Sequence, residues 1–263
     1  AEDCFGTNVH KLQGQCTRRK PKTTRTTYTP LPTHIMSKYK HITVCADVMK
    51  VNGLRFFLTV SKHIFFRTIY YCANGEAKNF AKCLTDIKRV AARRGFKIVQ
   101  FNLDGEFSPL QQLMADVNIN IVSRDEHVPE AERNVRTVKD RLRATLASLP
   151  FEKIPNRMLI ELAFGQVFWL NSFPNQYGVS KTLSPRTIMT GKEIDFNRHV
   201  RLVPGQYVQT HEEHGNDMTP RTLAGIALRP TGNDQGGHYF LSIPTGRVVN
   251  RNTWTELPMP NEI

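Results

Sequence analysis

Three acidic residues lie where the pattern of strands and helices predicts that their side chains could meet. Asp47 ends an apolar, β-branched run that begins near His41, and Asp104 follows a second such run over residues 96–103. Glu132 lies near the start of a long predicted helix that begins at Pro129. If the two strands are adjacent and parallel, both aspartates leave the sheet at one edge, where α/β proteins place their sites.

Carboxylates gathered at such an edge predict a metal centre, because they repel one another unless a cation neutralises them. Their oxygen atoms suit Mg²⁺ or Mn²⁺. Two such ions about 4 Å apart can activate an attacking oxygen and stabilise the leaving oxygen of a phosphodiester. We therefore predict that Asp47, Asp104 and Glu132 are catalytic residues and ligands of two metal ions. The plainer alternative is that the aspartates only end strands and cap turns.

Cations follow Glu132 along one face of its predicted helix. At about 100° per residue, Arg136, Lys139 and Arg143 fall within about 40° of Glu132. An apolar stripe about 240–320° from Glu132 marks the side expected to be buried, and it comprises Val135, Val138, Leu142, Leu146 and Leu149. The cations could track a phosphate backbone beside the metal ions. The alternative is an ordinary ion pair between Glu132 and Arg136 on a solvated face.

Other polar groups compete less well for the metal. Glu130 lies about 160° from Glu132 around the helix and suits the helix N-terminus. Asp125 and Glu126 precede Pro129 and are expected in a loop. The sequence His-Glu-Glu-His at 211–214 is not a zinc motif, and in a β region its histidines do not share a face, so a polar turn is expected there.

The predicted elements that position these residues follow the order β-β-β-α-β-α-β-α. Asn52-Gly53 marks the turn of a first hairpin. A strand that follows a crossover helix should lie parallel to the first strand. The fold class is therefore α/β, with a mixed five-stranded sheet flanked by helices. After the first strand, the expected elements are strands 54–60 and 64–71, helix 80–91, strand 96–103, a short helix 110–115, strand 117–122, and helices 129–149 and 155–171.

The length of 263 residues allows this domain and a smaller unit. The predicted division is a basic arm at 1–38, the core at 39–173, a connector at 174–199, and a small β-rich unit with a tether at 200–263. Strands of the last unit are expected at 206–210, 224–228, 238–243 and 247–250. In the arm, Arg18, Arg19 and Lys20 could lie along DNA phosphates, although a solvated tail with no partner is the alternative.

The charge balance favours a nucleic-acid partner. The chain has 36 Lys and Arg against 23 Asp and Glu, for a formal charge of +13. No apolar run is long enough to span a bilayer, so a membrane partner is not expected. Five scattered cysteines without a CxxC pair favour a reducing compartment over secretion. The first residues show no signal peptide and indicate a piece of a longer polyprotein.

Three phrases of the sequence resemble the integrase catalytic core of copia-type retrotransposons, a retroviral integrase-like member of the RNase H-like superfamily. They are residues 45–47, residues 104–107, similar to the family's DNGGEF, and residues 131–137, similar to its AERKNRT. Residues 183–187 and 246–251 are similar less specifically. Only 27 residues separate Asp104 from Glu132, fewer than in the family's pattern. His10, His34, Cys4 and Cys16 match no zinc-site spacing, so the family's N-terminal zinc module is not recognisable.

The resemblance implies a fragment of a Pol polyprotein with a defined activity. This would be a polynucleotidyl transferase that joins the 3′ ends of element DNA to target DNA and needs no small-molecule substrate. It further implies a homo-oligomer, because two DNA ends must be held together, and a location in the nucleus and in cytoplasmic virus-like particles. Two alternatives remain: an RNase H-like nuclease that cuts RNA in hybrids, and a decayed remnant that only binds nucleic acid.

Overall fold

The computed structural model describes residues 6–18, 20, 23–122 and 128–260. The chain divides into two compact units, which are described separately. The core unit comprises Thr27–Ala144 and Gln166–Glu193, and the β unit comprises Ala1–Thr26, Thr145–Gly165 and Ile194–Ile263. No helix among the described residues is both long enough and apolar enough to cross a membrane.

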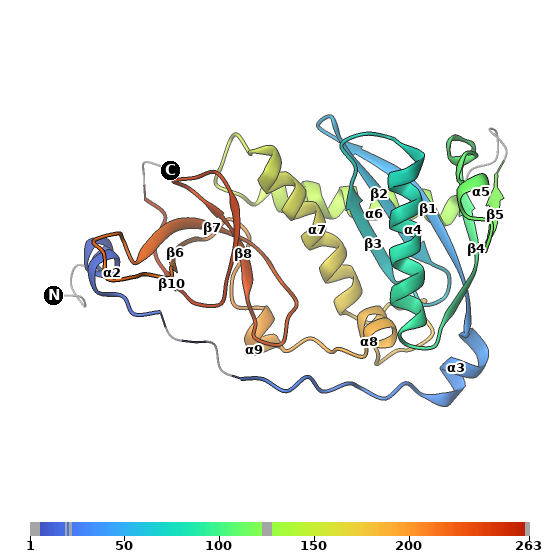
Figure 1. The fold of residues 1–263 in the computed structure, drawn as a ribbon, viewed down its shortest axis with the longest axis horizontal. Helices are drawn as coiled ribbons and strands as arrows, with labels where there is room; N and C mark the ends of the chain where they lie inside the picture. Colours follow the sequence, from blue (N-terminus) through green and yellow to red (C-terminus); the bar gives the residue numbers. More distant parts are fainter. Residues whose placement is uncertain (1–5, 19, 21–22, 123–127, 261–263) are drawn as a thin grey trace. The chain divides into compact units, whose positions relative to one another are not determined.

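A mixed five-stranded sheet forms the centre of the core unit (Figure 1). Its strand order is β3-β2-β1-β4-β5; β1, β2 and β3 pair antiparallel, whereas β4 is parallel to both β1 and β5. This arrangement confirms the predicted mixed five-stranded sheet and the parallel pairing of the first and fourth strands. The strands are β1 (His41–Val51), β2 (Leu54–Ser61), β3 (Arg67–Tyr71), β4 (Lys97–Leu103) and β5 (Asn118–Ile121).

The two turns of the antiparallel strands differ in how well the sequence predicted them. Asn52 and Gly53 adopt φ values of 46° and 77°, as the tight hairpin turn requires. The turn between β2 and β3 is wider than predicted, because His63 and Phe65 also have positive φ values of 64° and 60°. The third strand therefore starts at Arg67, three residues later than its apolar run.

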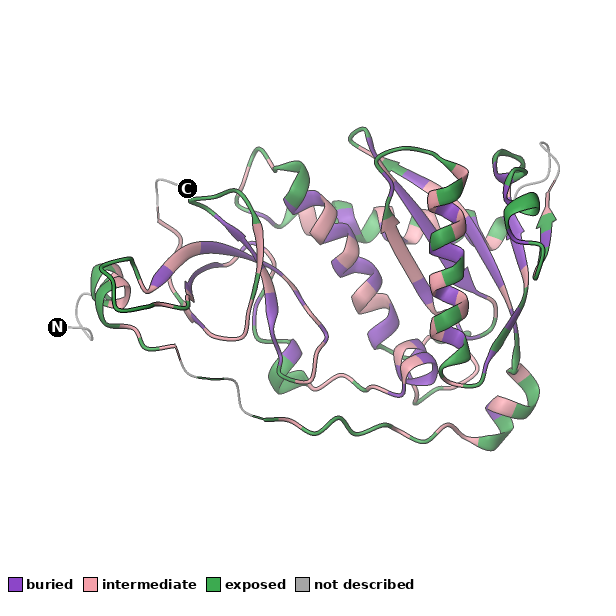
Figure 2. Cartoon of the chain, viewed as in Figure 1, coloured by how far each residue is buried: buried purple, intermediate pink, exposed green. Residues whose placement is uncertain are grey.

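Helices α4 (Ala77–Ala92) and α6 (Pro129–Ala147) cover opposite faces of this sheet. Phe80, Leu84 and Ile87 of α4 pack with alternate residues of the strands, among them Val44 and Phe101. The other face of β1 packs against the start of α6. Figure 2 shows the resulting division of α4 into a buried side and an exposed side, which is the amphipathic pattern that its sequence predicts.

The remaining helices of the core unit include two that the sequence did not indicate. One is α3 (Thr33–Tyr39), which lies at the end of the expected arm and has Ile35 in the core cluster. Within the segment expected as a connector, α8 (Pro185–Thr190) places Ile188 and Met189 in the core cluster. Its N-terminus is capped by Ser184 Oγ, which accepts a hydrogen bond of 3.1 Å from Thr187 N–H. A helix of six residues is too short for periodicity to reveal. The others are the 3-10 turn η1 (Gly105–Phe107), α5 (Leu110–Leu113) and α7 (Asn156–Ser172), which contributes to both units.

The β unit contains a second, antiparallel sheet of order β10-β6-β7-β8-β9. Four of its strands were predicted, whereas the three residues of β10 are too few to show alternation. The strands are β6 (Tyr207–His211), β7 (Thr222–Pro230), β8 (His238–Ser242), β9 (Val248–Arg251) and β10 (Trp254–Glu256), and the short helix α9 (Phe196–His199) precedes them. Phe240 and Trp254 lie in its apolar core.

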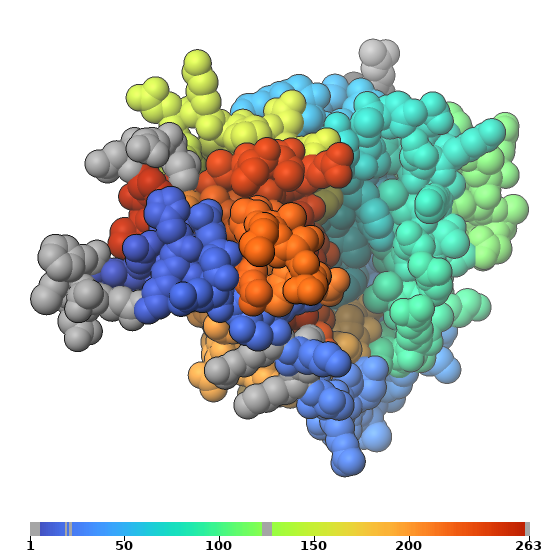
Figure 3. Space-filling view, turned by 60° about the vertical axis from the view of Figure 1, so that its left-hand side comes forward, coloured from blue at the N-terminus to red at the C-terminus, as the bar shows by residue number. Residues whose placement is uncertain are grey.

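Part of the expected basic arm belongs to this unit. Helix α2 (Val9–Gln15) begins at Asn8, whose side chain accepts hydrogen bonds from two backbone N–H groups of its first turn. It is joined to the segment before β7 by a hydrogen bond of 2.8 Å from Arg221 N–H to the carbonyl of Gln13. Figure 3 shows this helix, in blue, against the orange segments of the β unit. The arm is therefore partly helical.

The interior position of Leu84 gives a direct test of the core. Leu84 of α4 is fully buried, so Leu84→Ala should lower the free energy of unfolding by about 2–5 kcal/mol, through lost transfer energy and an unfilled cavity. Urea denaturation measures this change. The exposed Lys82 on the same helix is the control, and Lys82→Ala should change the value by less than about 0.5 kcal/mol. Equal effects of the two substitutions would contradict the assigned face of α4.

Candidate functional site

Asp47 does not end its strand, contrary to the prediction. Strand β1 continues to Val51, and Asp47 is paired with Leu58 of β2. The pairing with β4 stops earlier, at Cys45 opposite Asn102. Beyond Cys45, β1 is paired with β2 but no longer with β4. Asp47 therefore lies just past the end of the β1–β4 pairing, although it is still paired within the β1–β2 hairpin.

The register of β1 and β4 brings the two aspartates to the same place. Two residues beyond the Cys45–Asn102 pair, the same register sets Asp47 opposite Asp104. Asp104 keeps an extended backbone, with φ −72° and ψ 165°. Side chains alternate between the two faces of a sheet, so Asp47 lies on the same face as Cys45, and Asp104 lies on the same face as Asn102. Cys45 and Asn102 are on one face of the sheet, because Asn102 Nδ2 lies 3.7 Å from Cys45 Sγ. Asp47 and Asp104 therefore share that face.

The start of α6 packs on this face of the sheet. Val128 and Ala131 are buried against Cys45. Glu132 follows directly, and its backbone N–H donates a hydrogen bond of 3.1 Å to the carbonyl of Val128. Cys45 lies two residues before Asp47. The contact with Cys45 therefore places the first turn of α6, which includes Glu132, on the face of the sheet that holds the aspartates.

The charges of these carboxylates act on one another. Burial raises the pKa of Asp47 to about 6, and the charges of Asp104, Glu106 and Glu132 add to the increase. A hydrogen bond of 2.6 Å from Val48 N–H to Asp47 Oδ1 opposes it. Glu106 was not among the predicted site residues, although it lies two positions after Asp104 in the phrase that carries the resemblance. The structure thus adds a fourth carboxylate to the same electrostatic site.

The donor set fits a metal only in part. Asp104 Oδ1 is buried and has no hydrogen-bond partner among the described residues, and a buried oxygen of this kind suits a cation ligand. However, no three His, Cys, Asp or Glu side chains in the described parts of the chain converge closely enough to hold a metal ion. Asp47 and Asp104 are therefore compatible with a shared ion, whereas the predicted three-residue ligand set is not assembled in this structure.

The competing polar groups have other partners. Glu130 forms an ion pair of 3.1 Å with Lys62 in the turn between β2 and β3. Partial burial raises the pKa of Glu130, but hydrogen bonds and the charge of Lys62 lower it further than burial raises it. Asp125 and Glu126 lie outside the described residues. In the 211–214 segment, Glu212 pairs with Arg251.

The cations predicted to contact DNA are only partly where the sequence suggested. Arg136 and Arg143 are exposed and Lys139 is half-buried; Arg143 is 2.5 Å from Asp140. The buried positions of α6 are Ala131, Asn134, Val138 and Leu142. The buried stripe therefore includes the polar Asn134 and leaves Val135 partly exposed, so it is shifted slightly away from Glu132.

The basic residues of the arm have separate surroundings. Arg18 forms an ion pair with Glu213 of the β unit, so it is not part of an unattached tail. Lys20 is exposed, and Arg19 lies outside the described residues.

Comparisons with known proteins identify retroviral integrases as structures with some likeness. No protein-family model matches the sequence, and no curated protein matches it. The intasome of simian T-cell lymphotropic virus bound to a PP2A regulatory subunit is similar with 13% identity and a TM-score of 0.40, over 85% of this chain and 83% of that chain. The catalytic core of BIV integrase shares 16% identity with a TM-score of 0.36, over 56% of this chain and 92% of the other.

The catalytic core of HTLV-2 integrase with magnesium, in a trimeric form, shares 14% identity with a TM-score of 0.39, over 56% of this chain and 95% of that chain. All three TM-scores are low. The fold assignment therefore depends on strand order and direction in this chain.

The raised pKa of Asp47 predicts a pH-dependent effect of neutralising it. Its folded-state pKa of about 6 lies above the ordinary 3.8, so the folded protein binds a proton more readily than the unfolded chain does. Stability is then lost as the pH rises through that window. Asp47→Asn removes this loss and should raise the melting temperature by about 3–6 °C more at pH 7.5 than at pH 4.5, measured by thermal unfolding with EDTA present.

Asp140→Asn, at an exposed position of α6, is the matched control and should show no such pH dependence. A stability gain for Asp47→Asn that is the same at both pH values would show that the carboxyl is not destabilised by burial.

Proposed function

We propose that the chain is a divalent-metal-dependent polynucleotidyl transferase that joins DNA 3′ ends to a target DNA, the integrase of a copia-type retrotransposon and part of a Pol polyprotein. The observation that supports this most is the β1–β4 register, which sets Asp47 opposite Asp104 on the face that receives the first turn of α6. The buried, unpartnered Asp104 Oδ1 supports it further.

Asp47 and Asp104 would hold the first ion, and Glu132 or Glu106 would complete its ligands. A bound Mg²⁺ or Mn²⁺ supplies charge that activates an attacking oxygen and stabilises a leaving one. The chain's own part is positional: paired strands fix the two aspartates, and α6 carries the glutamate. With a pKa of about 6, Asp47 is mostly ionised near neutral pH and protonated in mild acid, so acid should weaken its binding of a cation.

DNA is the proposed partner. The formal charge of +13 and the exposed Arg136 near Glu132 on α6 suit a phosphate backbone. Joining two ends to one target requires two ends to be held together, so we include a homo-oligomer in the proposal. Residence in the nucleus and in cytoplasmic virus-like particles is the corresponding proposed location.

Removal of one ligand should abolish the reaction. In a strand-transfer assay with Mg²⁺ or Mn²⁺, Asp104→Asn should lower the rate at least about 100-fold, because charge stabilisation by the ion contributes several kcal/mol. Asp140→Asn, the same change on the exposed side of α6, should retain the wild-type rate. Full activity of Asp104→Asn would exclude this site.

The same assay identifies the third ligand and tests the alternatives. Loss of activity in Glu132→Gln but not in Glu106→Gln would assign Glu132. Cleavage of RNA in a hybrid without DNA strand transfer would instead identify a nuclease. Metal binding or DNA binding without either reaction would identify a decayed remnant.

The cations of α6 predict a change in salt dependence. Replacing Arg136, Lys139 and Arg143 together by Ala should reduce the slope of log K against log salt for duplex DNA by about 3, because each lost phosphate contact accounts for about 0.9. Fluorescence anisotropy over a range of salt concentrations measures the slope.

A triple change on α4 is the matched control, since this helix lies on the opposite face of the sheet. Lys78, Lys82 and Arg89 are exposed there, and their replacement by Ala should leave the slope unchanged. Equal reductions for the two triple variants would show that DNA is attracted by net charge and not by the α6 face.

A further inference from the structure

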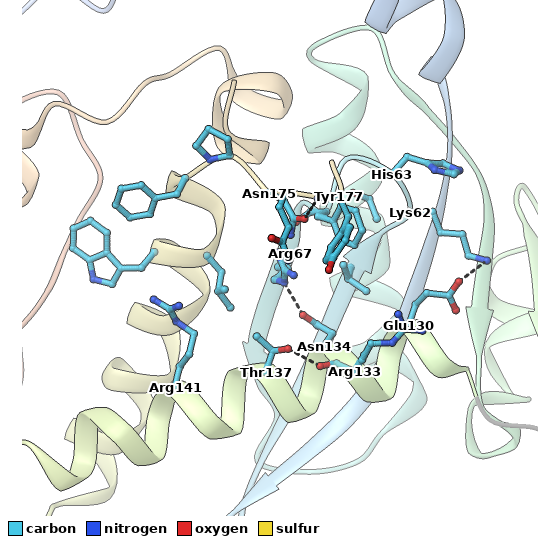
Figure 4. A pocket seen from close by; sticks show the side chains of 18 residues that line it. Lys62, His63, Arg67, Glu130, Arg133, Asn134, Thr137, Arg141, Asn175 and Tyr177 are labelled. Atoms are coloured by element: carbon cyan, nitrogen blue, oxygen red, sulfur yellow. Dashed lines mark hydrogen bonds and ion pairs between the residues drawn. The ribbon is translucent and has the colours of Figure 1, made fainter. Parts of the chain in front are cut away.

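A pocket of about 810 Å³ lies in the core unit (Figure 4). It is formed by the β2–β3 turn, one side of α6, and the end of α7 with the loop that follows. The α6 residues that line it, from Glu130 to Arg141, lie about 100–200° from Glu132 around the helix. The pocket and the carboxylates therefore occupy different sides of α6.

The lining of this pocket carries more positive than negative charge. Lys62 and Glu130 neutralise each other, which leaves the guanidinium groups of Arg67, Arg133 and Arg141. No carboxylate of the described residues forms an ion pair with any of these three. Glu130 also feels the charge of Arg133, but one carboxylate against Lys62 and three guanidinium groups leaves the lining with a positive surplus, which favours an anionic ligand.

Arg67 is buried, and hydrogen bonds fix the position of its charged group. The residue is only 7% exposed, and its guanidinium donates to two neutral oxygens, Asn134 Oδ1 at 2.8 Å and the carbonyl of Phe65 at 3.0 Å. Burial, and then the charge of Arg141, lower the pKa of Arg67 to about 10. It therefore remains protonated at neutral pH, although no carboxylate in the described part of the chain forms an ion pair with it.

Aromatic rings form the other part of the lining. Trp169 and Phe173 are stacked, with ring centroids 6.3 Å apart and an interplanar angle of 25°. Phe173 is 45% exposed and Tyr177 is 78% exposed, and both line the pocket. Figure 4 shows Tyr177 beside Arg67 and above the Asn134 side of α6. The exposed parts of aromatic side chains are surfaces on which a planar base can stack.

We propose that this pocket binds a nucleotide whose base is unpaired, with its phosphate on Arg141 and its base stacked on Phe173 and Tyr177. Cations that bind the backbone beside aromatic rings that stack bases are the combination that recognises single strands. A base inside a duplex is already stacked on both faces and is not available to the rings. The proposal rests on nucleic acid being the ligand, as in the proposed function, but not on the carboxylates being catalytic.

Binding to the full chain in EDTA tests this pocket without any catalytic step. The probes are a short fluorescein-labelled oligothymidylate and a blunt duplex of the same length. Phe173→Ala should weaken binding of the single strand about fivefold or more and leave duplex binding unchanged, because only the stack is lost. Arg141→Ala should also weaken binding of the single strand more than that of the duplex. Both side chains are exposed, so the variants should fold.

Arg143→Ala is the matched control, since it removes the same charge from the Glu132 side of α6. It should affect both probes by the same factor. Single-strand affinity that stays within about twofold of wild type in both Phe173→Ala and Arg141→Ala would overturn the proposal. An equal loss for the single strand and the duplex in Phe173→Ala would also overturn it.

Two further arms separate the possible outcomes. If thymidine monophosphate competes with the labelled strand, the site binds a free nucleotide. If only an unlabelled oligonucleotide competes, the site binds a nucleotide within a strand. Either result supports recognition of an unpaired base and its phosphate. If strand transfer is never detected while this binding and its loss in Phe173→Ala persist, the proposed activity fails and the pocket assignment stands.

Discussion

The parallel pairing of β1 with β4 is the interaction on which the candidate site depends. Its register sets Cys45 opposite Asn102 and therefore Asp47 opposite Asp104. A shift of one residue would turn one aspartate to the other face of the sheet, where α4 packs. The apolar residues that alternate with the aspartates fix this register, because Val44, Ala46, Phe101 and Leu103 must all enter the core cluster.

The same packing creates an electrostatic cost. The sheet face that carries the aspartates is partly covered by the start of α6, so Asp47 loses contact with water and its ionised form is disfavoured. A protein that only needed a stable fold would gain by placing a neutral side chain there. Unfavourable carboxylates at a strand edge are typical of sites where a cation is bound.

The sequence predicted the parts of the fold that depend on local patterns. Alternation and the Asn52-Gly53 turn indicated the strands, and the crossover helix indicated the parallel β1–β4 pair. The continuation of β1 past Asp47 could not be predicted, because it depends on pairing with a strand on one side only. The short elements α8 and β10 were missed for lack of length.

The site was predicted less completely than the fold. Asp47 and Asp104 could be placed from strand order alone, but the approach of Glu132 depends on how closely α6 packs, which no pattern in the sequence specifies. Asn134 was not among the residues of the predicted buried stripe, and its burial is explained by the hydrogen bond that its Oδ1 accepts from the Arg67 guanidinium of β3. The basic and aromatic pocket combines the β2–β3 turn, α6 and the end of α7, which are far apart in the chain.

The contacts of Arg67 have a mechanical consequence. Its backbone exchanges two hydrogen bonds with Asn171 of α7, and its side chain binds Asn134 of α6, so one residue of β3 connects both helices. Helix α6 carries Glu132 on one side and pocket residues on another. If α6 moves as a rigid body, a displacement that brings Glu132 nearer to Asp47 also changes the width of the pocket. If ligands at the two surfaces favour different positions of α6, they are thermodynamically linked, and each changes the affinity of the other by the same factor.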